Sequence, residues 1–255
     1  MLQSMEGERW RVAVTRDEDA NGPWHLALKE AGFEPIAMPI VIEGPPPEPA
    51  RLEASAKTLS AYDWVICASA RSVRALSEAR GSPFPEGPRT AAVGVVTAAA
   101  MRAAGARDPI CAETAGAKAL WDRLRGEDTW AGRRVLIATV PGGRRELIDG
   151  LRGAGASVDA IDCYAMQARP ADQIKRDWTA ARPDAALLAS PSTVLHLVDA
   201  IGVEALRALK AIVPIGMTTA GALASIGIDS VPPATATFEA VVEELVARAK
   251  VDPTA

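Results

Sequence analysis

Several features that mark other protein classes are scarce or missing in this chain. Its 255 residues include three cysteines, Cys67, Cys111 and Cys163, which lie far apart and show no CxxC or histidine-paired spacing. That pattern predicts reduced thiols rather than a disulfide framework or a metal site. No apolar run approaches the ~18 residues of a membrane span. Met1 to Trp10 carry charges rather than the apolar stretch of a signal peptide, so we expect a cytoplasmic protein with no membrane partner.

An excess of basic charge is also missing. The formal net charge is −4 at pH 7, whereas a protein whose main partner is nucleic acid needs a basic face. Nucleic acid is therefore not an expected partner. The GxSxG, HExxH and P-loop motifs are absent from the sequence, which argues against a serine nucleophile, a zinc centre and a nucleotide site. The sequence suggests no cofactor.

The main positive feature is an internal repeat. Ser69 closes the apolar segment that starts at Asp63, and Ser190 closes a similar segment 121 positions later. Thr97 and Thr219 each follow a glycine by three positions, and they lie 122 positions apart. Hydroxyl residues at matched places of a duplicated unit suggest a ligand that is held from two sides.

Short β-like segments alternate with helical patterns along the chain. Several of these segments are continuous apolar runs, which is typical of parallel strands covered on both faces. This alternation predicts an α/β fold with parallel sheets. The expected strands are Arg11–Val14, Pro35–Ile42, Trp64–Ala68, Thr90–Val93, Arg134–Ala138, Ser157–Tyr164, Ala185–Ala189 and Ala211–Pro214.

Proline placement suggests how the chain divides into domains. The segment Gly44–Pro49 and the pair Arg169–Pro170 interrupt the two repeats at corresponding places, and proline runs stiffen connections and avoid sheet interiors. We therefore expect a discontinuous α/β domain of residues 1–40 plus 168–255 and an inserted α/β domain of residues 48–158. Residues 41–47 and 159–167 would form a two-stranded connector, which would allow hinge motion about a central cleft.

Candidate binding residues follow the ends of the expected strands, where doubly wound sheets bind ligands. Hydroxyls and free N–H groups at helix starts are natural donors to carboxylates and phosphates. Taken singly, each hydroxyl is more often an ordinary helix cap than a ligand contact. Arg144 lies in a glycine-rich loop, where a guanidinium could hold a carboxylate. The other candidates are Thr15, Arg16, Ser69, Thr97, Ser190 and Thr219, with Thr218 as a competitor for Thr219.

Tyr164 is the candidate for chemistry. It closes the expected strand Ser157–Tyr164, which would aim its phenol toward the cleft. A phenol can donate or accept one hydrogen bond. The alternative is a half-buried packing tyrosine in the connector, and the local sequence leaves both open.

In combination, these residues resemble the uroporphyrinogen-III synthase family. The resemblance extends from about Arg11 to Ala249 and depends on the order and spacing of several motifs. They are Val14–Arg16, Gly32 with Pro39, Asp63–Ser69, Gly94–Ala98 with Gly105, Gly143-Arg144 before Leu147, Leu151 and Gly155, then Tyr164, Asp184–Ser190, Gly216–Ala220 and Gly227.

The resemblance implies two doubly wound, flavodoxin-like domains joined by a two-stranded connector. It also implies a cofactor-independent lyase of tetrapyrrole and haem biosynthesis, a hydro-lyase that cyclises the linear tetrapyrrole hydroxymethylbilane. The last ring would be inverted as water is lost, giving uroporphyrinogen III. Tyr164 would assist departure of the hydroxyl group. The residues expected to hold the substrate are Thr15, Arg16, Ser69, Thr97, Arg144, Ser190 and Thr219.

Two readings without catalysis remain open. The chain could be a two-domain protein that binds a small molecule, or a regulatory module that keeps the synthase fold and acts with a protein partner, since fold does not fix function. Because no long apolar edge or heptad pattern is present, a monomer is expected.

Overall fold

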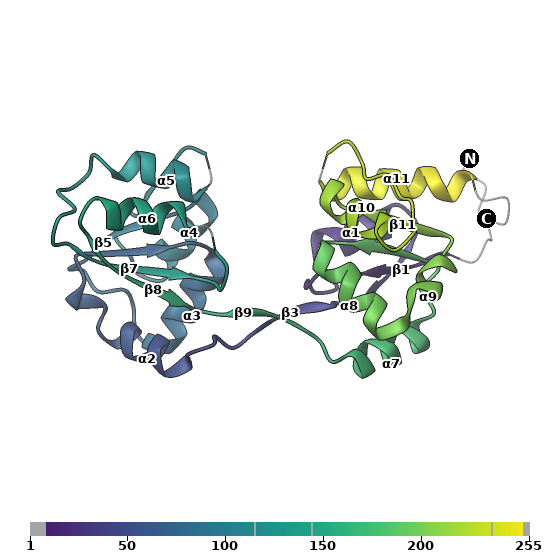
Figure 1. Ribbon diagram of the computed structural model, residues 1–255, viewed down its shortest axis with the longest axis horizontal. Helices are drawn as coiled ribbons and strands as arrows, with labels where there is room; N and C mark the ends of the chain where they lie inside the picture. The colour runs from purple at the N-terminus through teal and green to yellow at the C-terminus, as the bar shows by residue number, and fades with distance from the viewer. Residues whose placement is uncertain (1–8, 115, 144, 236, 252–255) are drawn as a thin grey trace. The chain divides into compact units, whose positions relative to one another are not determined.

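The chain forms two compact units in the computed structural model, which describes residues 9–114, 116–143, 145–235 and 237–251 (Figure 1). Unit 2 is the continuous segment Glu43–Ala165. Unit 1 is assembled from both parts of the chain outside it, up to Ile42 and from Met166 onward. Each unit contains a parallel sheet with helices on both faces. The α/β class with parallel sheets that the sequence predicts is therefore confirmed.

Unit 2 is built on a five-stranded sheet in the order β6-β5-β4-β7-β8. Its strands are β4 (Trp64–Cys67), β5 (Arg89–Ala92), β6 (Ile110–Cys111), β7 (Arg134–Thr139) and β8 (Ser157–Asp162). Its helices are α2 (Pro49–Lys57), α3 (Ala70–Arg80), α4 (Val95–Ala103), α5 (Ala117–Leu124), α6 (Glu146–Gly153) and the 3-10 helix η1 (Leu59–Ala61). Figure 1 shows α5 and α6 on one side of this sheet and α2 and α3 on the other.

Alternate residues of β4 serve the two faces of the unit 2 sheet. Val65 and Cys67 pack in the core under α3 and α4, whereas Trp64 and Ile66 pack in the core under α5 and α6. All four are fully buried, which explains the continuous apolar run in the sequence. The helices that follow β4 and β7 thus cover opposite faces. These two neighbouring strands mark the switch point of the sheet, where ligands usually bind.

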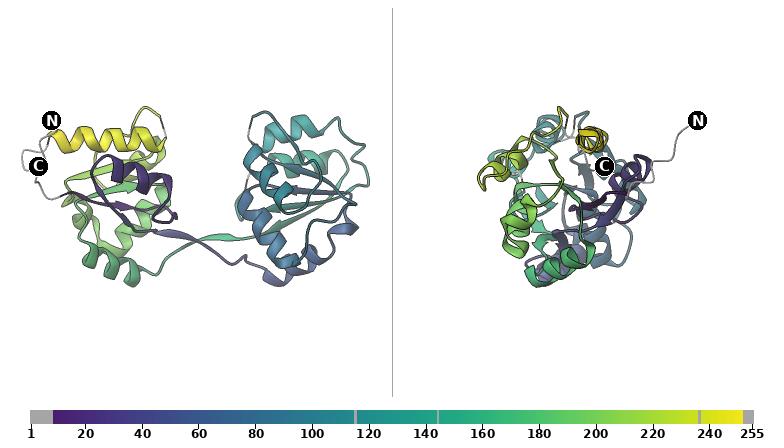
Figure 2. Two further views of the ribbon diagram at one scale, coloured as in Figure 1. Left: turned by 180° about the vertical axis from the view of Figure 1, so that it is seen from behind. Right: turned by 90° about the vertical axis from the view of Figure 1, so that its right-hand side faces the viewer.

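Unit 1 is built on a four-stranded sheet in the order β11-β10-β1-β2. Its strands are β1 (Arg11–Val14), β2 (Glu34–Ala37), β10 (Ala185–Leu188) and β11 (Ala211–Pro214). Its helices are α1 (Pro23–Glu30), α7 (Ala171–Ala181), α8 (Pro191–Ile201), α9 (Val203–Arg207), α10 (Met217–Ala224) and α11 (Phe238–Val251). The core under α1 and α11 is separate from the core under α7, α8 and α10, and Figure 2 shows the same layers from behind. The switch point lies between β1 and β10.

The central strand pairs of the two units share one register. Val12 of β1 faces Ala185 of β10 in unit 1, and Val135 of β7 faces Trp64 of β4 in unit 2. Corresponding residues are therefore 123 positions apart for β1 and β7 and 121 positions apart for β4 and β10. We call residues at these offsets matched. The two switch points therefore have strand pairs in the same register.

Two predicted boundaries differ from the structure by more than one residue. Residues 159–162, which the sequence places in the connector, belong to β8, because they pair with β7 as far as Asp162 opposite Thr139. The expected strand Pro35–Ile42 is divided. β2 ends at Ala37, opposite the last residue of β1, and β3 (Val41–Gly44) pairs instead with β9 (Ala165–Ala168) in a separate two-stranded sheet. In both cases a strand ends where its hydrogen-bonding partner ends.

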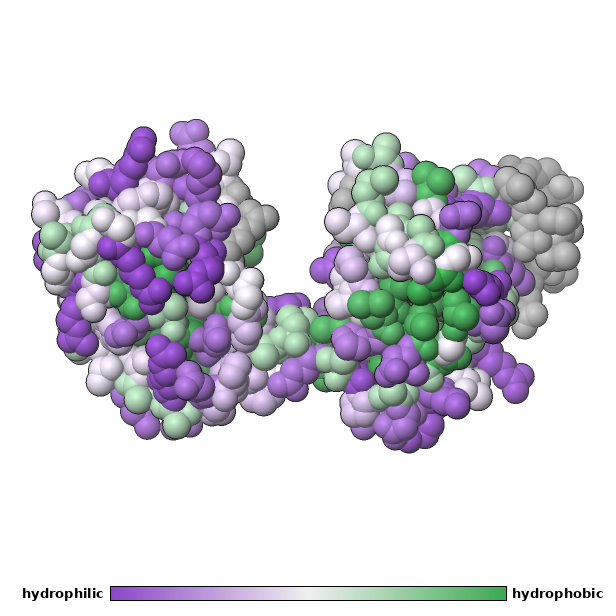
Figure 3. Space-filling view, in the orientation of Figure 1, coloured by the Kyte–Doolittle hydropathy of each residue, from purple (hydrophilic) through white to green (hydrophobic). Residues whose placement is uncertain are grey.

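Exposed apolar side chains are concentrated on a few helices. On the face of unit 1 seen in Figure 3, hydrophobic surface gathers over α8 and α9. Val95 and Val96 in the first turn of α4 are 66% and 72% exposed, and Met217 in the first turn of α10 is 75% exposed. Within the described residues, no helix combines the length and the apolar character that a membrane crossing requires.

Candidate active site

A pocket of about 430 Å³ lies in unit 2 at the carboxyl ends of β4, β5 and β7. This is the switch point of the sheet, where loops lead from the strands into helix N-termini. The pocket is lined mainly by apolar side chains, including Val93, Ile137, Val140, Leu147 and Ile148. Ser69, Thr139 and Tyr164 contribute the hydroxyl groups. Apolar walls with a few convergent polar groups are typical of small-molecule sites.

Tyr164 and Ser69 come together at this pocket. Tyr164 follows β8 and is 8% exposed, and its hydroxyl lies 3.3 Å from Ser69 Oγ. Ser69 is the N-cap of α3, where its Oγ accepts the backbone N–H of Ser72 at 3.1 Å. Ser72 Oγ in turn accepts the N–H of Ser69 at 3.0 Å. This reciprocal cap fixes the Ser69 side chain, so its oxygen is held within reach of the phenol.

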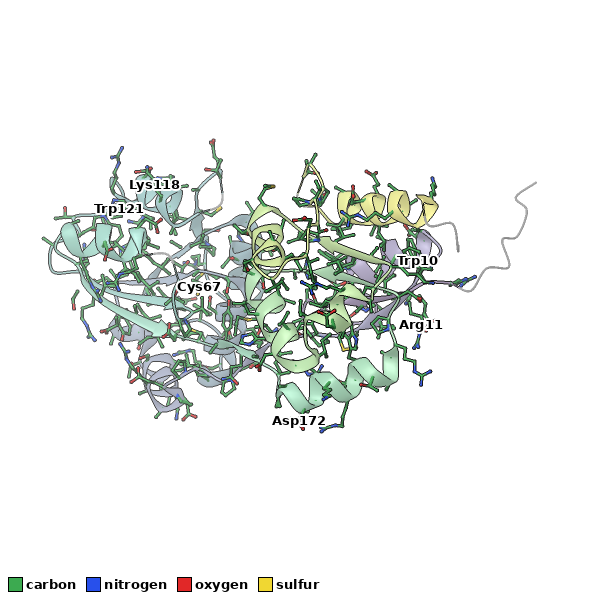
Figure 4. The ribbon with its side chains drawn as sticks, turned by 45° about the vertical axis from the view of Figure 1, so that its right-hand side comes forward. Trp10, Arg11, Cys67, Lys118, Trp121 and Asp172 are labelled. Atoms are coloured by element: carbon green, nitrogen blue, oxygen red, sulfur yellow. The ribbon has the colours of Figure 1, made fainter. Side chains whose placement is uncertain are left out.

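Two buried thiols directly precede pocket residues in the chain, Cys67 before Ala68 and Cys163 before Tyr164. Burial raises the pKa of Cys163, the residue before Tyr164, to about 12. Burial, with a smaller effect from nearby Cys163, also raises the pKa of Cys67 at the end of β4, which is labelled inside unit 2 in Figure 4. Both thiols therefore stay protonated at neutral pH, where a thiol is neither a strong nucleophile nor a metal ligand. Among the described residues, no group of three or more His, Cys, Asp or Glu side chains could hold a metal ion.

Ser190 occupies the matched cap position in unit 1. Its Oγ accepts the N–H of Thr193 at 3.2 Å and lies 2.9 Å from the hydroxyls of Ser192 and Thr193. The residue 123 positions before Tyr164 is Val41, so the matched place carries no phenol. The two serines therefore share a capping role, but of the two only Ser69 contacts a tyrosine, Tyr164.

Thr15 and Arg16 follow β1 at the switch point of unit 1. Thr15 is 1% exposed, and its hydroxyl donates to the carbonyl of Leu187 at 2.6 Å, which ties β1 to β10. Arg16 lies 3.3 Å from the carboxylate of Glu18 and 5.5 Å above the ring of Trp24. The Thr15 hydroxyl is thus committed to the fold, whereas the Arg16 side chain remains 42% exposed.

Thr97 and Thr219 are the third residues of α4 and α10, and both are buried, at 7% and 1% exposure. Their helices begin after Gly94 and Gly216, which provide no side-chain cap. The first-turn N–H groups therefore lack a side-chain acceptor from their own cap residue, although the N–H of Thr219 donates to the carbonyl of Gly216 at 3.1 Å. Thr218, the competitor of Thr219, is exposed. The remaining candidate, Arg144, lies outside the described residues.

The pocket also includes residues that sequence reasoning did not select. Thr139 ends β7 much as Ser69 follows β4, so its position after an apolar strand was a usable signal. Leu147 and Ile148 gave no such signal, because apolar residues at helical spacing usually belong to the core. Their contribution to a pocket depends on the small residues that line it with them, Gly116 and Ala117.

Comparison with known proteins adds independent information. The family model described as "Uroporphyrinogen-III synthase HemD" matches residues 23–243. A uroporphyrinogen-III synthase from Synechococcus elongatus is 26% identical over 248 residues, which cover 94% of this chain and 88% of that protein.

Two solved structures have a similar fold. A mutant uroporphyrinogen III synthase from the extremely thermophilic bacterium Thermus thermophilus has a TM-score of 0.58 at 18% identity, with 95% of this chain and 100% of that chain covered. Uroporphyrinogen-III synthetase from Helicobacter pylori has a TM-score of 0.59 at 16% identity, with 94% and 99% covered. The family match extends over most of the sequence and includes the strands and helices that form the Tyr164 pocket. The chain therefore belongs to the uroporphyrinogen-III synthase family.

Proposed function

We propose that this protein is a uroporphyrinogen-III synthase that cyclises hydroxymethylbilane, with loss of water and inversion of the last ring. Family membership supports the reaction. The structural observation that carries the proposal is the Tyr164 hydroxyl, which lies in an apolar pocket at the switch point of unit 2. A hydroxyl group that leaves as water needs a proton donor in such a place.

Tyr164 is proposed to supply that proton. The C–O bond of the hydroxymethyl group breaks, its electron pair leaves with the oxygen, and the phenol proton converts the leaving group to water. The pyrrole nitrogen donates electrons as the C–O bond breaks, and the loss of the oxygen leaves the methylene carbon electrophilic. The last ring attacks through its substituted carbon, and the spiro intermediate fragments and recloses with that ring inverted. The proton lost as the ring regains aromaticity returns to the tyrosinate, so the enzyme ends unchanged.

The fold would contribute mainly through positioning. Hydroxymethylbilane can also close without inversion, so the enzyme must hold the chain in one geometry, and positioning alone can supply a large part of a rate enhancement. We place its carboxylates at the first turns that contain Thr97 and Thr219, where glycine caps leave N–H groups to a ligand. Ser69 and Ser190 at their helix caps, together with Arg16 and Arg144, are further contacts in this proposal. Thr15 supports the site by joining β1 to β10.

The architecture proposed for the enzyme is a pair of flavodoxin-like domains related by a duplication. The domain bounds proposed from the sequence, 1–40 plus 168–255 and 48–158, are supported by the two compact units Glu43–Ala165 and the remainder. In unit 1 the strands in chain order run 2-1-3-4 across the sheet, which is the flavodoxin order without its last strand. We propose a monomer in the cytoplasm.

The decisive experiment supplies freshly generated hydroxymethylbilane to the purified protein and separates the I and III isomers by chromatography. Predominant III isomer at a rate proportional to enzyme concentration is expected. Formation of the I isomer alone, at the rate seen without protein, would remove the proposal. Stoichiometric binding of the tetrapyrrole without turnover would favour the non-catalytic binding or regulatory reading.

A further inference from the structure

Several residues that line the pocket of unit 2 are matched in unit 1 by bulkier residues. At the offset of 123, Leu147 matches Trp24, and Thr139 matches Arg16. Ala117 matches Phe238 at an offset of 121, because the buried residues Ala117, Leu120 and Leu124 of α5 correspond to Phe238, Val241 and Leu245 of α11. The helices beside the matched strands thus carry aliphatic or small residues around the pocket in unit 2, Leu147 and Ala117, and two aromatic rings in unit 1, Trp24 and Phe238.

In unit 1 the matched region is closely packed. The indole of Trp24 is 1% exposed and lies under the guanidinium of Arg16. Glu18 accepts the backbone N–H groups of Trp24 and His25, at 3.0 and 3.2 Å, and lies 3.1 Å from the His25 ring. Phe238 packs against the same core. The Trp24 ring, the Arg16 guanidinium and the Glu18 carboxylate therefore contact one another in unit 1, in the region that matches the open pocket of unit 2.

We infer that the pocket of unit 2 is a subsite for a single pyrrole ring, the ring of the linear tetrapyrrole that bears the hydroxymethyl group. The inference rests on the proposed function and adds to it which part of the substrate enters which unit. A volume of about 430 Å³ is near the lower end of the ~300–1,000 Å³ range of ligand pockets. One substituted ring fits such a volume, whereas four linked rings do not.

The chemistry of the pocket matches that ring. Aliphatic walls such as Val93 and Leu147 suit the faces of a heteroaromatic ring, and Ser69 or Thr139 can accept the hydrogen bond of its pyrrole N–H. Tyr164 lines the same pocket, so a ring bound there would have the proton donor beside its hydroxymethyl group. No lysine or arginine is among the described residues that line the pocket. A ring that becomes positively charged as its hydroxyl leaves therefore meets no like charge from them.

Filling the pocket tests the inference directly. Ala117→Phe introduces the residue that unit 1 has at the matched position. The probe is porphobilinogen, a single pyrrole with one acetate, one propionate and one aminomethyl group, titrated by calorimetry. Saturable binding to the unmodified protein is expected, with an affinity reduced at least ~10-fold in Ala117→Phe, since small changes in pocket volume have effects of that size. The rate of III-isomer formation should fall in parallel.

Two further variants control for disruption of the fold. Ile148→Phe narrows the same pocket from α6 at a half-buried position, so it gives a second test if Ala117→Phe does not fold. Lys118→Phe adds the same ring at the neighbouring position of α5, where the lysine is 77% exposed (Figure 4). It should leave porphobilinogen affinity and turnover unchanged. Thermal unfolding of each variant checks that the units remain folded.

The outcomes separate this inference from the proposed reaction. If the unmodified protein forms the III isomer while both pocket variants keep full affinity and turnover, the ring subsite is wrong and the reaction stands. A second outcome is that porphobilinogen binds the unmodified protein, that this binding is lost in the pocket variants, and that no III isomer forms. In that case the ring subsite stands and the reaction fails. Absence of saturable binding by the unmodified protein would also overturn the subsite.

Discussion

Unit 1 and unit 2 place matched strands side by side at their switch points, β1 with β10 and β7 with β4, in the same register. The ends of these strands are used differently. In unit 2 they border a pocket lined by Ser69, Thr139 and Tyr164. In unit 1 the matched region is occupied by the indole of Trp24 beneath Arg16. Two sheets can therefore share one strand register while a few side chains decide whether a site opens.

The outer edge of the sheet is a second difference. In unit 2, β6 pairs with β5 at this edge. In unit 1 the corresponding strand β11 is the last of the sheet, and the carbonyl of Ile212 accepts side-chain hydrogen bonds from Ser230 at 2.6 Å and Arg248 at 2.7 Å. An edge carbonyl still needs a hydrogen-bond donor. In unit 1 side chains provide the donors, whereas in unit 2 the additional strand β6 pairs with β5.

The largest expected effect concerns the tyrosine that unit 1 lacks at its matched position. Tyr164→Phe should slow formation of the III isomer by at least ~10-fold, because general acid catalysis contributes ~10²–10⁴-fold. Tyr62→Phe is the matched control. Tyr62 is equally buried at 8% exposure, but its hydroxyl donates to Asp159 at 2.8 Å. Rates and isomer ratios measured for both variants settle the point, and equal turnover in the two would remove Tyr164 from the mechanism.

The next effect concerns the edge of unit 1. Arg248→Ala should lower the free energy of unfolding by roughly 1–3 kcal/mol, because it removes charge-assisted hydrogen bonds to the part-buried carbonyl of Ile212 and to the exposed carbonyl of Val231. Arg176→Ala removes an exposed ion pair with Asp172, labelled in Figure 4, and should cost less than ~1 kcal/mol. Denaturant unfolding of the two variants compares them. A similar loss in both would show that Arg248 is an ordinary surface residue.

The two serine caps provide a smaller, symmetric test. Ser69→Ala and Ser190→Ala should each lower the free energy of unfolding by about 1 kcal/mol, because each removes an N-cap acceptor. Ser69→Ala also removes the contact with the Tyr164 hydroxyl, so its rate of III-isomer formation should fall further than that of Ser190→Ala. Unfolding curves and turnover are measured together. A larger rate loss in Ser190→Ala would contradict the assignment of the proton donor to unit 2.

The smallest effect uses the cysteines, all three of which lie in unit 2. Cys67 and Cys163 are buried and burial raises the pKa of each, whereas Cys111 is half-buried. Alkylation by iodoacetamide near pH 8 should therefore modify Cys111 first, since a thiol must be ionised and accessible to react. Peptide mass spectrometry at successive times measures the order in which the three cysteines are alkylated. Early labelling of Cys163 would show that the buried core that contains Cys163 and Tyr164 opens easily.

The strands of the sheets were largely predictable from the sequence. β1 and β11 have the predicted bounds, because fully buried parallel strands read as continuous apolar runs. β6 was missed, since its two residues, Ile110 and Cys111, are defined by pairing with β5 rather than by a local pattern. The division of Pro35–Ile42 into β2 and β3 was missed for a similar reason, because β2 ends with its partner β1.

The candidate site was predictable in part. The position of Ser69 after an apolar strand and before a helix indicated an N-cap, and the structure confirms this role. The roles of the candidates in binding substrate stay predictions. The pocket wall could not be predicted from the sequence, because Leu147 and Ile148 look like core residues unless the small residues that line the pocket with them are known.

The sequence by itself determined the alternation of strands and helices, the internal repeat and the hydroxyl residues at strand ends, because these depend on local periodicity and spacing. Tertiary structure decided which strands became neighbours, so that Ser69 and Tyr164, far apart in the chain, meet at 3.3 Å. It also decided that the matched region of unit 1 is filled by Trp24 while that of unit 2 stays open. Cavities and contacts of this kind depend on side-chain volumes brought together from distant segments, which no local pattern records.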